Sequence, residues 1–373
     1  MKKKYLLACA CVAMVAALAC CLAGCATDES KAKDVGKLID KIYVQERTKT
    51  TDADCKAAKD AWDKLTDKQK EMVKGENADP DYFGRDTGDA SADDPLNQDG
   101  IGEKEILVVS FGTSFNDSRV ATIGGIEKAI AAAYPDWSVR RAFTAQIIIN
   151  HIQARDGEVI DNVEQAMDRA VANGVKQLIV QPTHLMHGAE YDELVEAINK
   201  YADKMTITFA EPLLGEVGAD ATVINADKKA VAEAVVADAA VPEDTALVLM
   251  GHGTSHTANI TYTQMQTQMD ELGYKNVFIG TVEGEPEGTD AESIIAKVKE
   301  AGYEKVVLRP LMVVAGDHAN NDMADPDDDE SWYSQFTAEG NFAADNVTCQ
   351  IAGLGQIPAV QQIYVAHTAA AIG

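Results

Sequence analysis

The chain is poor in basic residues and, outside its first residues, in cysteine. Only 33 of the 373 residues are Lys or Arg, against 60 Asp or Glu, so the formal net charge is −27. No stretch concentrates positive charge, which excludes a nucleic-acid partner. Five of the seven cysteines lie within the first 25 residues, and only Cys55 and Cys349 remain in the body. This excludes a scaffold built on disulfides, and an apolar content of 46% indicates a globular protein.

The motifs of several common enzyme classes are also missing. There is no G-x-x-x-x-G-K-[ST] loop, no G-x-S-x-G elbow and no H-E-x-x-H pair. The nearest dinucleotide fingerprints fail, because His256 and Pro358 stand where a third glycine belongs. We therefore expect no nucleotide cofactor, and neither a serine hydrolase nor a zinc protease of that type.

The first 25 residues have the features of an export signal. Three lysines are followed by an uncharged run from Tyr5 to Ala23 and by Leu22-Ala23-Gly24-Cys25. The last four residues resemble a bacterial lipobox, which implies that residues 1–24 are a lipoprotein signal peptide and that Cys25 is lipidated. The alternative is a single membrane-spanning anchor. Both predict an extracytoplasmic, membrane-anchored protein, in the periplasm or on the outer face of the cell membrane.

Two segments precede the main body. Apolar residues at helical spacing, and a capping box formed by Thr66 and Gln69, predict a small helical module over 25–75. From Glu76 to Gly100 there are eight acidic residues and a single basic residue, Arg85. We expect residues 76–104 to be a solvated acidic linker.

From residue 105 onward, short apolar β-rich runs alternate with helical patterns, which is typical of a parallel α/β sheet. The segment 106–114 (ILVVSFGTS) resembles 247–255 (LVLMGHGTS), and 180–188 (VQPTHLMHG) resembles 308–316 (LRPLMVVAG). We predict a tandem duplication of a four-stranded parallel sheet flanked by helices, with halves at 105–242 and 243–373 and a ligand cleft between them. The expected strands are 106–111, 138–143, 177–182, 205–210, 245–250, 276–281, 305–310 and 346–351.

Polar side chains that could carry chemistry follow several of these strands. His184 and His187 come after the strand expected at 177–182, and His252 and His256 come after the strand expected at 245–250. Imidazole binds divalent metals and exchanges protons near neutral pH, although each of these histidines could instead cap a helix or satisfy a loop carbonyl. Other candidates are the strand-end carboxylates Glu211 and Glu283, which could be solvated loop charges, and a cluster further on that contains Asp317 and His318.

Residues 105–370 resemble the CbiK-type anaerobic cobalt chelatases, class II tetrapyrrole chelatases that insert cobalt into sirohydrochlorin or its precursor precorrin-2 during cobalamin synthesis. The motifs that carry the resemblance include "VVSFGTSFNDSR", "QPTHLMHGAEYDELV", "MGHGTSHTA" and "LRPLMVVAGDHANNDMA". The resemblance implies that His184, Glu211 and His252 bind the metal and that His184, His252 and Glu283 act in catalysis. We expect tetrapyrrole contacts from Ser110, Gly112, Thr113, Ser114, Gly253, Thr254, Ser255, Asp317 and His318.

Metal insertion exchanges two pyrrole protons for one divalent cation and needs neither ATP nor a covalent nucleophile. The substrate metal expected from the resemblance is Co²⁺, while Ni²⁺ and Fe²⁺ would use the same residues. Because the export signal is unusual for a biosynthetic enzyme, an exported haem-, tetrapyrrole- or metal-binding lipoprotein is the alternative, and a homo-oligomer stays open. An anionic tetrapyrrole would need local cations, for which the candidates are Arg119, Arg140, Arg141, Arg155 and Arg309.

Overall fold

The structure, a computed structural model, describes residues 27–373. The predicted signal peptide and Cys25 therefore lie outside the described residues. The chain divides into two compact units, of which the first ends at Asp86 and the second spans Thr87–Gly373. Within residues 27–373, no helix combines the length and the apolar character that crossing a membrane requires.

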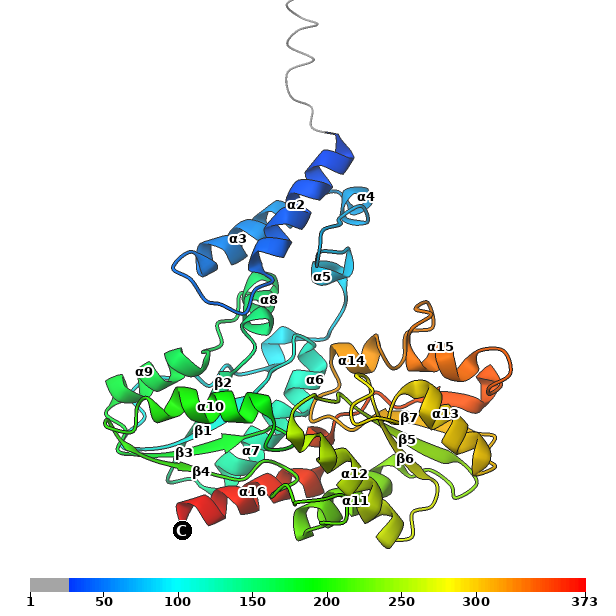
Figure 1. Ribbon diagram of the computed structural model, residues 1–373. Helices are drawn as coiled ribbons and strands as arrows, with labels where there is room; N and C mark the ends of the chain where they lie inside the picture. Colours follow the sequence, from blue (N-terminus) through cyan, green and yellow to red (C-terminus); the bar gives the residue numbers. More distant parts are fainter. Residues whose placement is uncertain (1–26) are drawn as a thin grey trace, which may run out of the picture. The chain divides into compact units, whose positions relative to one another are not determined.

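The first unit is helical, as its sequence pattern predicts (Figure 1). Helix α2 (Asp28–Ile42) is capped by the Thr27 hydroxyl and buries an apolar stripe against α3 (Thr51–Trp62). The capping box of Thr66 and Gln69 at α4 (Asp67–Lys70) is confirmed. A further turn, α5 (Asp81–Gly84), buries Tyr82 and Phe83. This part of the expected linker is therefore folded.

The second unit contains two parallel sheets of identical strand order (Figure 1), which confirms the predicted fold class. The first has the order β2-β1-β3-β4 and the second β6-β5-β7-β8. The central strands β1 and β5 are buried almost throughout, which explains their continuous apolar sequences. The strands are β1 (Lys104–Ser110), β2 (Ser138–Phe143), β3 (Gln177–Pro182), β4 (Thr206–Phe209), β5 (Ala246–Gly251), β6 (Val277–Thr281), β7 (Val306–Pro310) and β8 (Val347–Cys349).

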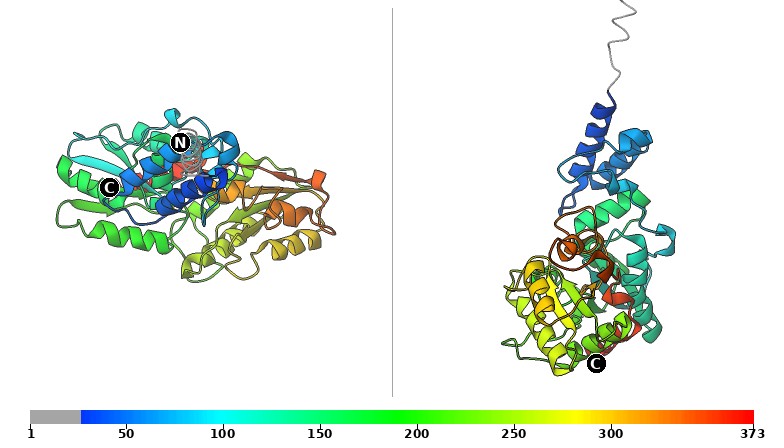
Figure 2. Two further views of the ribbon diagram at one scale, coloured as in Figure 1. Left: turned by 90° about the horizontal axis from the view of Figure 1, so that it is seen from above. Right: turned by 90° about the vertical axis from the view of Figure 1, so that its right-hand side faces the viewer.

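Helices cover the sheets, and the two halves lie side by side (Figure 2). The last helix, α16 (Pro358–Ile372), belongs to the second half in sequence but packs on α7, α11 and β3. Its Tyr364 hydroxyl donates to the Thr183 carbonyl at 2.9 Å. The last helix of the chain therefore completes the packing of the first half. The other helices of this unit are α6 (Asn116–Ala121), α7 (Ile123–Ala133), α8 (Gln146–Asp156), α9 (Val163–Asn173), α10 (Ala189–Asn199), α11 (Ala226–Ala239), α12 (Ile260–Glu271), α13 (Ala291–Glu300), α14 (Asp317–Asn320) and α15 (Trp332–Thr337).

A buried charge network joins the end of the expected linker to the first half. Asp93, which follows a short 3-10 turn (Ala90–Ala92), accepts hydrogen bonds from Arg119 at 2.6 Å and from Arg141 at 2.6 Å. These two arginines, although burial opposes them, lower the pKa of Asp93 to about 2. Glu127 is the second carboxylate on Arg141, with oxygen–nitrogen distances of 2.8 and 2.7 Å. The solvated-linker prediction is therefore wrong at Asp93, whose side chain is only 2% exposed.

A second buried pair in this half is looser. The Glu105 carboxylate lies 3.7 Å from the Arg140 Nε atom, and neither of its oxygens has a hydrogen-bond partner among the described residues. Burial raises the pKa of Glu105 to about 7. Because this pKa is higher in the folded state than in the unfolded chain, the contribution of Glu105 to stability falls as the pH rises from about 4.5 to 7.

Replacing Glu105 with Gln should remove this part of the pH dependence. Between pH 4.5 and 8, we expect the wild type to lose on the order of 2–3 kcal/mol of unfolding free energy relative to Glu105→Gln. Urea unfolding at several pH values measures the difference. The matched control is Glu103→Gln, an exposed position two residues earlier, which should leave the wild-type profile unchanged. Parallel pH profiles for the wild type and Glu105→Gln would contradict the assignment.

Candidate functional site

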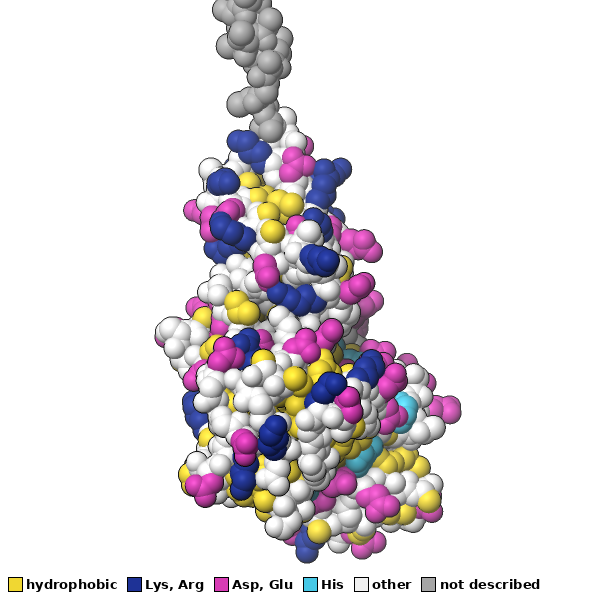
Figure 3. Space-filling model, turned by 90° about the vertical axis from the view of Figure 1, so that its left-hand side faces the viewer, with side chains coloured by type: hydrophobic (Ala, Val, Ile, Leu, Met, Phe, Trp, Pro, Cys, Tyr) yellow, Lys and Arg dark blue, Asp and Glu magenta, His cyan; other side chains and the backbone are white. Residues whose placement is uncertain are grey.

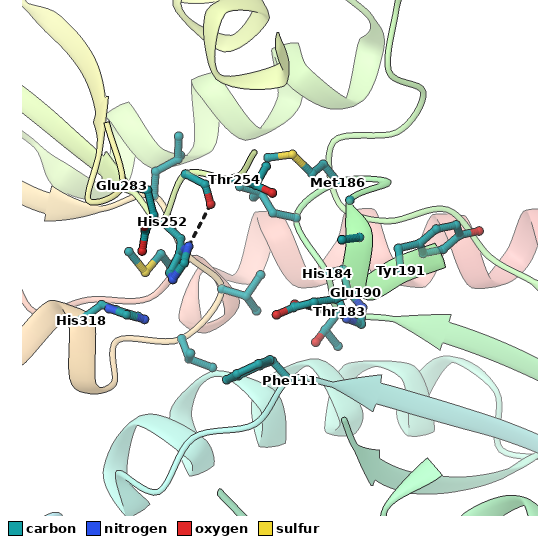
Figure 4. A pocket seen from close by; sticks show the side chains of 18 of the residues that line it. Phe111, Thr183, His184, Met186, Glu190, Tyr191, His252, Thr254, Glu283 and His318 are labelled. Atoms are coloured by element: carbon teal, nitrogen blue, oxygen red, sulfur yellow. Dashed lines mark hydrogen bonds and ion pairs between the residues drawn. The ribbon is translucent and has the colours of Figure 1, made fainter. Parts of the chain in front are cut away.

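A cavity of about 550 Å³ lies between the two halves (Figure 4). Its walls are the segments that follow the carboxyl ends of β1, β3, β5, β6 and β7, which is where ligands bind in open parallel sheets. On one face of the molecule, histidine side chains lie beside hydrophobic ones (Figure 3). The predicted cleft between the halves is therefore present.

Two equivalent glycine turns shape the cavity. Gly112 after β1 and Gly253 after β5 have φ values of +105° and +93°. A Cβ atom at Gly112 would lie 2.6 Å from the Phe143 ring, and one at Gly253 would lie 2.8 Å from the Cβ of Glu283. Both turns therefore require glycine. This explains why the Gly-Thr-Ser sequence occurs at the same place in each half.

The second half supplies two histidines and a carboxylate to one wall. The His252 and His318 rings meet edge to face, with centroids 4.6 Å apart. Glu283 also lines the cavity, and its backbone N–H donates to the His252 carbonyl at 2.9 Å. Figure 4 shows these three side chains together on one side of the cavity. Imidazole and carboxylate are both ligands of divalent transition metals.

Hydrogen bonds orient both rings of this wall. The Nδ1 atom of His252 lies 2.8 Å from the Gly253 carbonyl oxygen, and that of His318 lies 2.5 Å from Oδ2 of Asp322. In each case the contact favours the tautomer with the proton on Nδ1, which leaves the Nε2 lone pair available. The hydrogen bond to Asp322 also raises the pKa of His318. A metal ion at His318 therefore competes with a proton.

The opposite wall comes from the first half and carries His184 and Glu190. The side chain of His184 is 6% exposed, and its two ring nitrogens have no hydrogen-bond partner among the described residues. Burial lowers the pKa of His184 to about 4, so its imidazole is neutral at pH 7. A carboxylate oxygen of Glu190 lies 3.9 Å from its Nε2 atom. This wall therefore presents a neutral base next to an acidic group.

The two halves contribute different side chains to the site at equivalent positions. In the aligned segments, Phe111 of the first half corresponds to His252 of the second. Two residues beyond the second pair of segments, Glu190 corresponds to His318. The paired imidazoles thus occur on one side only. A cation bound there would face His184 across the cavity.

The other predicted residues are divided between cavity and surroundings. Glu211 is not among the lining residues; its carboxylate lies 3.1 Å from the His187 Nε2 atom and is half-exposed. Thr113 and Ser114 face the start of α6, where Arg155 donates to the Ser114 carbonyl at 2.6 Å. Asp317 accepts from the Asn321 amide at 2.7 Å. The predicted residues that do line the cavity are Ser110, Gly112, His184, His252, Gly253, Thr254, Ser255, Glu283 and His318.

Two features of the wall differ from expectation. The lining residues include neither Lys nor Arg among the described residues. Side chains of the arginines proposed to supply positive charge, Arg119, Arg140, Arg141, Arg155 and Arg309, are at most 9% exposed and pair with carboxylates. In residues 27–373, no group of three or more His, Cys, Asp or Glu side chains is assembled to hold a metal ion.

Several lining residues were not predicted from the sequence. Glu190 is the most important, and the repeat contained a signal for it, because it stands two residues after Gly188 as His318 stands two after Gly316. Tyr262 was also missed; its hydroxyl accepts from the Gly253 N–H at 3.1 Å. The remaining unpredicted lining residues are Phe111, Thr183, Leu185, Met186, Gly188, Ala189, Tyr191, Glu285, Leu311, Met312, Val313 and Val314.

The family model described as cobalt chelatase (CbiK) matches residues 104–373. The chain belongs to the CbiK cobalt chelatase family. It is 35% identical over 266 residues to the sirohydrochlorin cobaltochelatase of Salmonella typhimurium, covering 71% of this chain and 95% of that protein. It is 30% identical over 241 residues to the sirohydrochlorin cobaltochelatase CbiKC of Nitratidesulfovibrio vulgaris, covering 64% and 81%.

Among solved structures, SirB from Bacillus subtilis with Fe³⁺ matches with a TM-score of 0.47 and 17% identity, over 71% of this chain and 94% of that chain. The match to the CbiK family model begins at residue 104, so the first unit lies outside it.

Proposed function

We propose that this member of the CbiK family is a sirohydrochlorin cobaltochelatase, which places Co²⁺ in sirohydrochlorin and releases two protons. The observation that carries the proposal is the cavity with oriented imidazoles on one wall and a neutral, buried imidazole on the other. This arrangement suits a reaction in which a cation enters a ring from one face while protons leave. The reaction requires neither a nucleotide nor a covalent intermediate.

On the metal side, the Nε2 atoms of His252 and His318 and the carboxylate of Glu283 hold the incoming cation. These replace the earlier assignment of Glu211, which is turned toward His187. Imidazole and carboxylate bind Co²⁺, Ni²⁺ and Fe²⁺ alike, so metal choice depends on geometry and supply. The physiological metal is proposed to be cobalt on the strength of the relatives' names.

On the proton side, His184 accepts a proton from a pyrrole N–H as the metal–nitrogen bonds form. A histidine whose pKa is about 4 holds a proton only briefly, so it needs a second acceptor. Glu190 is 3.9 Å away and 54% exposed, which lets it pass the proton to solvent. The step repeats for the second pyrrole proton.

The macrocycle itself is held largely without cationic side chains. Phe111 and the apolar segment Leu311–Val314 offer surfaces for the ring. Peripheral carboxylates are held by backbone N–H groups at the Gly112 and Gly253 turns or remain in solvent at the cavity mouth.

We further propose that the protein is a lipoprotein attached to a membrane through Cys25 and acts outside the cytoplasm. The support for this is the sequence Leu22-Ala23-Gly24-Cys25 after an uncharged run. Along the chain, the helical unit that ends at Asp86 lies between Cys25 and the second unit.

The test is cobalt insertion measured on purified protein comprising residues 27–373. We expect multiple turnovers, followed by the absorbance change of sirohydrochlorin on addition of Co²⁺, above the rate without protein. Haem titration of the same preparation provides the comparison. Tight binding of haem or of a metallated ring without turnover would overturn the enzymatic proposal and support an exported tetrapyrrole-binding protein.

A further inference from the structure

A second histidine–carboxylate pair lies just outside the cavity. The Nε2 atom of His187 is 3.1 Å from Oε2 of Glu211, and the side chains are 26% and 56% exposed. The His187 ring also packs edge to face on Tyr191, with centroids 4.6 Å apart. Because Tyr191 lines the cavity, the pair flanks the site from the side of the first half.

The separation of the two donor atoms suits a shared cation. Bonds of about 2.1 Å to one metal ion place neighbouring ligand atoms about 3.0–3.4 Å apart in octahedral or tetrahedral geometry. The observed 3.1 Å falls in this range. No third His, Cys, Asp or Glu joins them among the described residues, so water would fill the remaining positions. Such a site suits a hydrated cation that is held weakly.

The backbone around the pair is fixed to the cavity wall. The Glu211 carbonyl accepts hydrogen bonds from the Gln181 amide at 3.2 Å and lies 3.0 Å from the His367 Nδ1 atom. Nearby, the Leu213 N–H donates to the His184 carbonyl at 3.0 Å. His184 and His187 belong to one short loop, with the first side chain in the cavity and the second outside it.

We propose that His187 and Glu211 form an auxiliary site for a hydrated divalent transition-metal ion, from which the ion passes to the cavity. The binding claim is independent of the chelatase reaction, whereas the passage to the cavity rests on the proposed function. The site raises the local concentration of the cation beside the cavity without holding it tightly. It differs from the cavity site in using half-exposed ligands on the first half only.

The test begins with Co²⁺ alone, with no tetrapyrrole present, and protein comprising residues 27–373 without a histidine tag. Equilibrium dialysis and the visible absorption of bound Co²⁺ should detect one equivalent of weakly bound Co²⁺. His187→Ala and Glu211→Gln should each abolish its binding. The matched control, Glu216→Gln, changes an exposed glutamate on the same segment by the same charge and should retain this equivalent. His252→Ala should also retain it, because that change affects only the cavity.

Kinetics then test the passage of the ion. In His187→Ala we expect the KM for Co²⁺ to rise about fivefold while kcat stays within about twofold, because the cavity residues are intact. Unchanged Co²⁺ stoichiometry and spectrum in both His187→Ala and Glu211→Gln would overturn the site. Loss of the equivalent with an unchanged KM would overturn its role in delivery. Absence of insertion by the wild type would refute the proposed function and leave the binding result to stand by itself.

Discussion

We expect His252→Ala to lower cobalt insertion at least about 100-fold, with sirohydrochlorin binding largely retained. The reason is that the rings of His252 and His318, which both line the cavity, are in direct contact, with centroids 4.6 Å apart. Removing one leaves a single imidazole and Glu283, which cannot hold a partly dehydrated cation against the ring face. The loss should fall mainly on kcat/KM for Co²⁺, measured by steady-state insertion kinetics at several cobalt concentrations.

His256→Ala provides the matched control for this prediction. His256 stands four residues further along the same loop, but it faces Asp192 at 3.4 Å and is absent from the cavity wall. We expect its replacement to change insertion by less than about threefold. His318→Ala should behave like His252→Ala. If His252→Ala and His256→Ala have the same activity, the imidazole wall is not the metal site.

The positions of the strands could be predicted from the sequence because parallel strands are continuous apolar runs. The expected run at 245–250 corresponds to β5 (Ala246–Gly251), and that at 346–351 to the shorter β8 (Val347–Cys349). The repeated Gly-Thr-Ser turns located the cavity, since both lie at strand ends. Local patterns therefore determined the sheets and the place of the site.

Long-range pairing was not predictable in the same way. Helix α16 is apolar over most of its surface, so its sequence does not reveal which half it covers. Glu211 follows β4, but whether its side chain faces the cavity or His187 depends on the path of the chain after an edge strand. The arginines were the largest error, because a buried guanidinium and an exposed one look alike in a sequence. Burial depends on carboxylates distant in the chain, such as Asp93 for Arg141.

Arg141→Met should destabilise the protein by about 3–5 kcal/mol at pH 7. Arg141 is 1% exposed and donates to two buried carboxylates, Asp93 and Glu127, through two pairs of hydrogen bonds. Without it, Asp93 keeps Arg119 as a partner, whereas Glu127 loses the guanidinium that bonds its carboxylate. The cost is the uncompensated burial of that charge, measured as unfolding free energy in urea.

The pH dependence of this loss distinguishes lost charge pairing from lost packing. Burial raises the pKa of Glu127 above its ordinary value, and removing Arg141 removes the main opposing influence. Folded Arg141→Met therefore binds a proton that the unfolded chain releases above about pH 4.5, so its stability falls as the pH rises and the deficit is larger at pH 8 than at pH 5. Arg309→Met is the matched control, because its partner Asp238 is 37% exposed and can return to water; its deficit should be smaller and nearly independent of pH. The loss of unfolding free energy in Arg141→Met could instead be equal at pH 5 and pH 8. That result would mean that the packing of the arginine side chain, and not its charge, holds residues 87–100 against the rest of the second unit.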